Sequence, residues 1–194
     1  MYCDPPPAEL PLEQVVAAVG ELVADGTVRA WAIVNWPADR VAAAGRIARE
    51  QGVPAPCAAQ LPYNLVARDW VEGPEMSEAL ALCDARVVAS FVLAGGALSG
   101  KYATPGASGR LTGELDSPRA QAALAVVEPL RALADEAGTT PAALAMAFAL
   151  ANDRVASVLF GATTPEQVRE NVRAADVVNA LSARQLEALR ATGG

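Results

Sequence analysis

Two side-chain amides stand where α/β proteins place residues that bind ligands. Asn35 follows a short apolar run that predicts a buried strand, and Gln60 lies in the next such run. The carboxyl ends of parallel strands are where such proteins bind their ligands. An amide there donates and accepts hydrogen bonds, so the pair could hold a carbonyl or a carboxamide group. The alternative reading is two ordinary amides satisfied within the core.

A second feature is the segment 161–167, with the sequence Gly-Ala-Thr-Thr-Pro-Glu-Gln. Thr164 and Gln167 have the spacing of a capping box at the start of a helix. Free backbone N–H groups and the positive end of the helix dipole make such a turn a site for anions. The alternative is a capping box that only begins a surface helix.

A segment rich in glycine and proline over residues 102–115 is expected to be a mobile loop. One cation precedes this segment and another lies within it. They are Lys101, the only lysine of the chain, and Arg110. Both could contact phosphate groups, or they could be solvated surface charges.

Composition excludes several kinds of protein. The chain has 194 residues, of which 53% are apolar, as expected for one soluble domain. It has no histidine, which excludes histidine-based triads and metal centres. The net charge of −7 disfavours nucleic acid and anionic membranes as partners. Three unpaired cysteines and the absence of a leader at the start of this sequence predict a cytoplasmic protein without metal or disulfides.

Strand and helix patterns alternate along the chain. We expect helices at 12–25, 38–51, 75–83, 117–138, 140–151 and 182–191, with Pro129 kinking or splitting the fourth. We expect strands at 27–34, 57–61, 86–91 and 155–160. This alternation predicts parallel βα units. Four buried strands are too few for a closed barrel, which needs about eight.

Four blocks of residues, each near a strand end, resemble the aldo-keto reductase family. They are residues 35–36, 60–65, 93–102 and 161–171. The resemblance implies an α/β fold that is half of a (β/α)8 TIM-type barrel, formed by one domain over residues 1–194. It covers the fifth to eighth strands of the family's barrel.

The resemblance also implies a site for NADP and shows departures from it. The cofactor-binding positions it marks are Asn35, Gln60, Lys101, Arg110, Gly161, Thr163, Gln167, Glu170 and Asn171. Asp4 aligns with the family's catalytic His, and the strands that carry the family's Asp, Tyr and Lys have no counterpart. Val34 replaces a carboxamide-binding Ser, and Ser90 replaces the Tyr that stacks on the nicotinamide. NADP is therefore a possible but doubtful cofactor, because the positions that would hold its nicotinamide have changed.

Three functions remain open. The first, which we favour, is a non-redox enzyme (cyclase, dehydratase or isomerase) acting on a carbonyl-bearing small molecule. Its catalytic residues would be Asn35 and Gln60 as hydrogen-bond donors and Asp4 as acid or base. The second is an NADPH-dependent oxidoreductase completed by a partner chain, and the third a non-catalytic subunit that binds a cofactor or metabolite. Open sheet edges predict a homo-oligomer, in the simplest case a homodimer.

Overall fold

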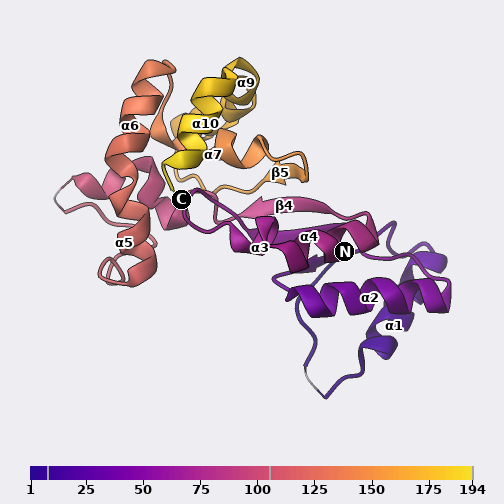
Figure 1. Cartoon of the computed structure of the whole chain (residues 1–194). Helices are drawn as coiled ribbons and strands as arrows, with labels where there is room; N and C mark the ends of the chain where they lie inside the picture. Colours follow the sequence, from indigo (N-terminus) through magenta and orange to yellow (C-terminus); the bar gives the residue numbers. More distant parts are fainter. Residues whose placement is uncertain (8, 105, 194) are drawn as a thin grey trace. The chain divides into compact units, whose positions relative to one another are not determined.

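The computed structural model describes residues 1–7, 9–104 and 106–193 and has an α/β fold (Figure 1). Its strands form one five-stranded sheet in the order β1-β2-β3-β4-β5. The neighbours β1, β2 and β3 pair in parallel. The expected α/β fold, consistent with part of a TIM barrel, is confirmed, with five strands where the sequence predicted four.

The chain divides into two compact units, which are described separately. Unit 1 comprises Met1–Pro62 and Asp69–Val88, and unit 2 comprises Tyr63–Arg68 and Ala89–Gly194. The expectation of a single domain stays a prediction.

Unit 1 contains three strands and the helices that follow them. The strands are β1 (Tyr2–Cys3), β2 (Ala32–Val34) and β3 (Ala58–Pro62), and the helices are α1 (Leu12–Ala24), α2 (Ala38–Gln51), α3 (Asp69–Glu72) and α4 (Pro74–Cys83). Helix α2 has the predicted bounds, because Gly52 ends it in the left-handed conformation at φ 69°. The four-residue α3 was not predicted.

Strand β2 is shorter than the predicted strand over residues 27–34. The residues after α1 form a turn instead of pairing. The Thr27 N–H donates to Asp25 Oδ1 at 2.8 Å, and the Val28 N–H donates to the Leu22 carbonyl at 3.0 Å. These backbone groups are satisfied within the turn, so the ladder begins only at Ala32.

Strand β1 was not predicted as a strand, because two residues carry no readable periodicity. Tyr2 pairs with Ala32 and Cys3 with Ile33. The fully buried Trp36 supports this pairing, since its indole N–H donates to the Cys3 carbonyl at 3.0 Å. Trp36 also packs edge-on against Trp31, with ring centroids 6.3 Å apart.

Strand β4 (Arg86–Ser90) begins in unit 1 and ends in unit 2. Unit 2 further contains β5 (Val155–Val158), two 3-10 helices, η1 (Ala94–Ser99) and η2 (Lys101–Ala103), and the helices α5 (Pro118–Ala125), α6 (Val127–Glu136), α7 (Pro141–Leu150), α8 (Pro165–Val172), α9 (Ala174–Ala180) and α10 (Ala183–Ala191). Helix α7 forms its core, with eight consecutive buried residues from Ala142 to Ala149. The buried Tyr63 packs on Phe148 of this helix, with ring centroids 5.4 Å apart.

Proline 129 splits the predicted helix over 117–138, as expected. The break falls at Val126, and Pro129 is the third residue of α6. The N–H groups of the first turn of a helix have no intrahelical partner, so a proline in the first turn of α6 removes no hydrogen bond. Helix α9 was not predicted. The predicted loop over 102–115 consists of η2 and turns. Pro105 lies outside the described residues.

Candidate phosphate-binding site

A cavity of about 400 Å³ in unit 2 brings together four residues that the sequence marked for cofactor binding. They are Lys101, Arg110, Gly161 and Thr163. The remaining lining comes from the turn after β4, from Gly109, and from the segment that follows β5. The cavity therefore joins two of the four sequence blocks.

The turn after β4 has an unusual backbone. Phe91 and Ala94 have positive φ values of 57° and 46°, and Gly95 and Gly96 follow at 70° and 95°. A side-chain-bearing residue in this region costs about 1–3 kcal/mol and persists only where its surroundings hold it. Such strain is concentrated at binding sites, which agrees with the position of Phe91 in the cavity wall.

Asn64 provides that hold. Its side chain is fully buried, and Nδ2 donates to the Phe91 carbonyl at 3.0 Å. Its Oδ1 accepts from the Val66 N–H at 3.0 Å. Asn64 thus fixes the strained turn to the segment after β3, a role that its sequence block did not disclose.

Two glycines lie next to the Lys101 side chain. A Cβ on Gly96 would come within 2.9 Å of Lys101 Cε, and a Cβ on Gly109 would overlap the Lys101 ammonium group. The ammonium nitrogen also lies 4.8 Å from the centroid of the Tyr102 ring. The glycines therefore leave room for an exposed, flexible cation, which could contact a phosphate group.

The hydroxyl of Tyr102 links the turn at Gly95 to the segment at Leu111 through hydrogen bonds. It donates to the Gly95 carbonyl at 3.3 Å and accepts from the Leu111 N–H at 3.0 Å. Because Arg110 precedes Leu111, this bond holds the backbone next to the arginine.

The opposite wall is the turn that begins α8. The Thr164 hydroxyl accepts from the Gln167 N–H at 3.3 Å, as a helix cap does. Gln167 does not return the bond to Thr164, so the predicted capping box is wrong in this detail. Its Oε1 instead accepts from the Thr163 N–H at 2.7 Å and from the Thr163 hydroxyl at 3.2 Å. A reciprocal box forms at Ser182 and Gln185 of α10.

Three of the predicted positions, Gln167, Glu170 and Asn171, lie on α8 and do not line the cavity. Glu170 is exposed, whereas the Asn171 side chain is buried with 6% exposure.

The two cations of the cavity are not neutralised by carboxylates. Over the described residues, the ion pairs are Glu128–Arg131 in α6 and Glu166–Arg169 in α8. Lys101 and Arg110 take part in neither, although the chain as a whole carries a net charge of −7. A pocket that keeps two free positive charges in an acidic protein suits an anionic ligand.

The three predicted catalytic residues lie in unit 1. Val34 pairs with Gln60 across β2 and β3, and the Asn35 N–H donates to the Gln60 carbonyl at 3.0 Å. Asn35 has a positive φ of 55° and an exposed side chain, and Gln60 is half-buried. Asp4 follows β1 and is exposed. The backbones of Asn35 and Gln60 are thus neighbours at one strand end.

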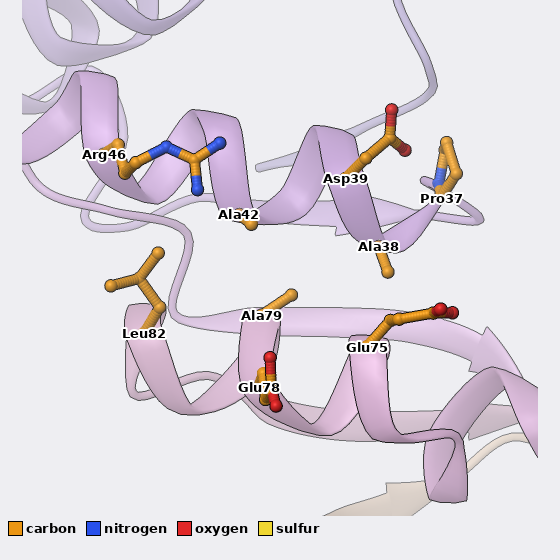
Figure 2. Close-up of a pocket in the computed structure, with 9 residues that line it drawn as sticks. All are labelled: Pro37, Ala38, Asp39, Ala42, Arg46, Glu75, Glu78, Ala79 and Leu82. Atoms are coloured by element: carbon orange, nitrogen blue, oxygen red, sulfur yellow. The ribbon is translucent and has the colours of Figure 1, made fainter.

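A larger cavity, of about 720 Å³, lies between α2 and α4 of unit 1 and holds none of the predicted residues. It exists because small side chains (Ala38, Ala42 and Ala79) face one another across the two helices, as Figure 2 shows. Arg46 and Leu82 stand at one end of this groove, and Glu75 stands at the other (Figure 2).

No metal centre is apparent in the described part of the chain, where no three His, Cys, Asp or Glu side chains are grouped closely enough to hold an ion. Burial raises the pKa of the Cys3 and Cys83 thiols. Cys57 is exposed. None of the helices in the described residues is long and apolar enough to span a bilayer.

The fold and this site define a parallel α/β protein with a cavity, lined by Lys101 and Arg110, at a strand-to-helix turn. The chain belongs to the aldo/keto reductase family, whose model matches residues 1–193.

Curated proteins are similar to the chain over most of its length. A putative voltage-gated potassium channel subunit beta of Schizosaccharomyces pombe is 32% identical, over 91% of this chain and 54% of its own length. Probable subunits beta of Arabidopsis thaliana and Oryza sativa are 31% and 29% identical, over 94% and 98% of this chain and 57% and 60% of their lengths. The chain thus spans little more than half the length of the relatives it matches.

Proposed function

We propose that unit 2 binds NADP(H) through the phosphate groups of the cofactor. The observation that carries the proposal is the cavity that Lys101 and Arg110 line together with the Gly161–Thr163 turn. Family membership supports the choice of ligand. The free charges of Lys101 and Arg110 would pair with phosphate oxygens.

NADP(H), when bound, supplies a hydride to a carbonyl or accepts one from an alcohol. The residues of this chain would bind and orient its phosphate end. The chain has no histidine, so it does not supply the histidine of the family's proton-donating site. We therefore infer that unit 2 acts as a cofactor-binding part, and that reductase activity requires proton-donating residues from another source. Its expected cytoplasmic location remains part of this proposal.

The test is a titration of the whole chain with NADPH, followed by the cofactor's fluorescence. We expect saturable binding that Lys101→Gln and Arg110→Gln each weaken by about 10-fold, since a charge-assisted bond is worth about 1.5–3 kcal/mol. Arg184→Gln, on the exposed face of α10, removes the same charge away from the cavity and should leave binding unchanged. Absence of binding by the unaltered chain would refute the proposal.

A second candidate, the non-redox enzyme, is supported by one observation. The Asn35 N–H donates to the Gln60 carbonyl at the neighbouring ends of β2 and β3, and a side-chain amide at such a strand end could polarise a carbonyl group. A carbonyl-bearing small molecule would be its substrate. Screening such compounds for turnover without cofactor tests it, and activity that survives the double variant Asn35→Ala/Gln60→Ala would count against these residues.

A further inference from the structure

The groove between α2 and α4 of unit 1 has no part in the proposed function. Its volume is about 720 Å³, and Ala38, Ala42 and Ala79 face one another across it (Figure 2). Ala38, Ala42 and Arg46 follow one another at intervals of four residues along α2, so the groove runs along this helix for roughly 12 Å. A groove with small side chains between two helices can receive the side chains of a third helix.

The groove continues at its Glu75 end into a second hollow of about 230 Å³. The linings of the two cavities have Pro37, Ala38 and Glu75 in common. Trp70 of α3 lines the second hollow and is 39% exposed, whereas the other two tryptophans of the chain are buried. Tryptophan is one of the residues most enriched among those that dominate the energy of protein interfaces. The hollow therefore offers an aromatic contact to a partner that lies in the groove.

The charges around the two hollows are mainly negative. Among the described residues that line them, Arg46 is the one cation, and the carboxylates are Asp39, Asp69, Glu75 and Glu78. None of these side chains belongs to the ion pairs found in the described part of the chain. Asp39 and Glu75 stabilise the first turns of α2 and α4, whereas Glu78 lies beyond the first turn of α4. The surface is thus complementary to a basic partner.

We propose that the groove between α2 and α4 is a docking site for a basic, amphipathic α-helix of another protein. The apolar face of that helix packs on the alanines, and a lysine or arginine contacts Trp70 and the Glu75 carboxylate. An extended peptide fits less well, because its backbone N–H and C=O groups would lie unpaired against alanine side chains. A second copy of this chain is disfavoured by its net charge of −7. The inference does not depend on NADP(H) binding by unit 2.

The test titrates the whole chain with synthetic peptides and follows tryptophan emission. Two amphipathic peptides without tryptophan serve as probes, one of leucine and lysine and one of leucine and glutamate, each of about 18 residues so that a helix can form. Covering the exposed Trp70 should shift the emission to shorter wavelength, and Trp70→Phe should remove the shift. We expect the lysine peptide to bind at least about 10-fold more tightly than the glutamate peptide. No shift with the lysine peptide, equal affinity for both peptides, or a shift that persists in Trp70→Phe would each refute the proposal.

A pair of charge variants separates the groove from the general acidity of the chain. We expect Glu75→Gln/Glu78→Gln to weaken binding of the lysine peptide by about 5-fold, as expected for two exposed ion pairs. Glu21→Gln/Glu50→Gln removes the same charge at exposed positions outside both hollows and should leave binding unchanged. Equal losses in the two double variants would show unspecific attraction to an acidic protein and would overturn the proposal.

A pair of size variants tests the groove itself. Ala42→Phe fills the groove and should weaken binding of the lysine peptide by at least about 10-fold, because the helix loses its contact with the alanines. Ala81→Phe places the same ring on an exposed position of α4 outside the lining and should have no effect, and circular dichroism checks that both variants fold. Unchanged binding by Ala42→Phe would refute the site. Sedimentation without peptide identifies the other occupant: if Ala42→Phe dissociates oligomers of the unaltered chain, a second copy occupies the groove and the proposal is wrong.

Discussion

The side chain of Asn64 holds the carbonyl group of Phe91 at 3.0 Å, across 27 positions of the sequence. This single bond links the segment after β3 to the strained turn that lines the cavity of unit 2. The shape of that cavity therefore depends on a residue that does not line it.

Replacing Asn64 by Asp tests this dependence with almost no change of volume. A carboxylate cannot donate to the Phe91 carbonyl, and it would be charged in a fully buried position. We expect a loss of about 3 kcal/mol or more in the free energy of unfolding, measured with urea. Asn152→Asp, which alters a half-buried amide bonded to the Tyr63 hydroxyl, is the comparison and should cost less. An equal or smaller loss for Asn64→Asp would show that the turn does not need this bond.

The carboxamide of Gln167 competes with any anion for the donors of Thr163. Its Oε1 takes both the N–H and the hydroxyl of that residue. Gln167→Ala frees them, so we expect pyrophosphate to bind up to about 10-fold more tightly, as one neutral hydrogen bond is worth about 0.5–1.5 kcal/mol. Calorimetry would measure the change.

Gln185→Ala is a matched control for this experiment. Gln185 holds Ser182 through the same pair of bonds at the start of α10, outside the cavity lining. The substitution Gln185→Ala removes a comparable cap without freeing donors in the cavity. Weaker binding of pyrophosphate to Gln167→Ala would mean that Gln167 itself contacts the ligand.

Periodicity and turn residues predicted most elements, because these signals are local. The bounds of α2 follow from Pro37 and Gly52, and the start of α7 follows from the Thr140 cap. Strand β1 and helix α3 escaped prediction, because two and four residues are too short for periodicity to show. Strand β1 forms only by pairing with β2, about 30 positions further along the chain (32 − 2).

The candidate site was predictable in its charges and not in its contacts. Lys101, Arg110, Gly161 and Thr163 were marked by the family resemblance and line one cavity. The contact of Arg119 with Phe91 was not predicted, because it joins residues 28 positions apart (119 − 91) that no motif links. The bond from Gln167 to Thr163 in place of Thr164 depends on a side-chain rotamer, which spacing does not determine.

The three thiols should differ in reactivity towards iodoacetamide. Burial raises the pKa of Cys83 and of Cys3, so each is less ionised at pH 8 than an ordinary thiol, and the thiolate is the reactive form. Cys57 is exposed. Mass spectrometry of the native chain should find Cys57 alkylated first, and all three alkylated together in urea. Early labelling of Cys83, which is 8% exposed, would show that α4 opens readily.

Self-association is expected from the apolar surface of unit 2. Val168 and Val172 are 44% and 55% exposed and lie one turn apart on α8, and β5 is an end strand of the sheet. We propose that a second copy covers this surface in a homodimer. Sedimentation should show association that rises with concentration, and Val168→Lys/Val172→Lys should weaken it by at least about 10-fold, because burying two unpaired charges costs more than 1.4 kcal/mol. Ala175→Lys, exposed on α9, is the control. A monomer over the whole concentration range would refute self-association, and unchanged association of the double variant would place the contact elsewhere.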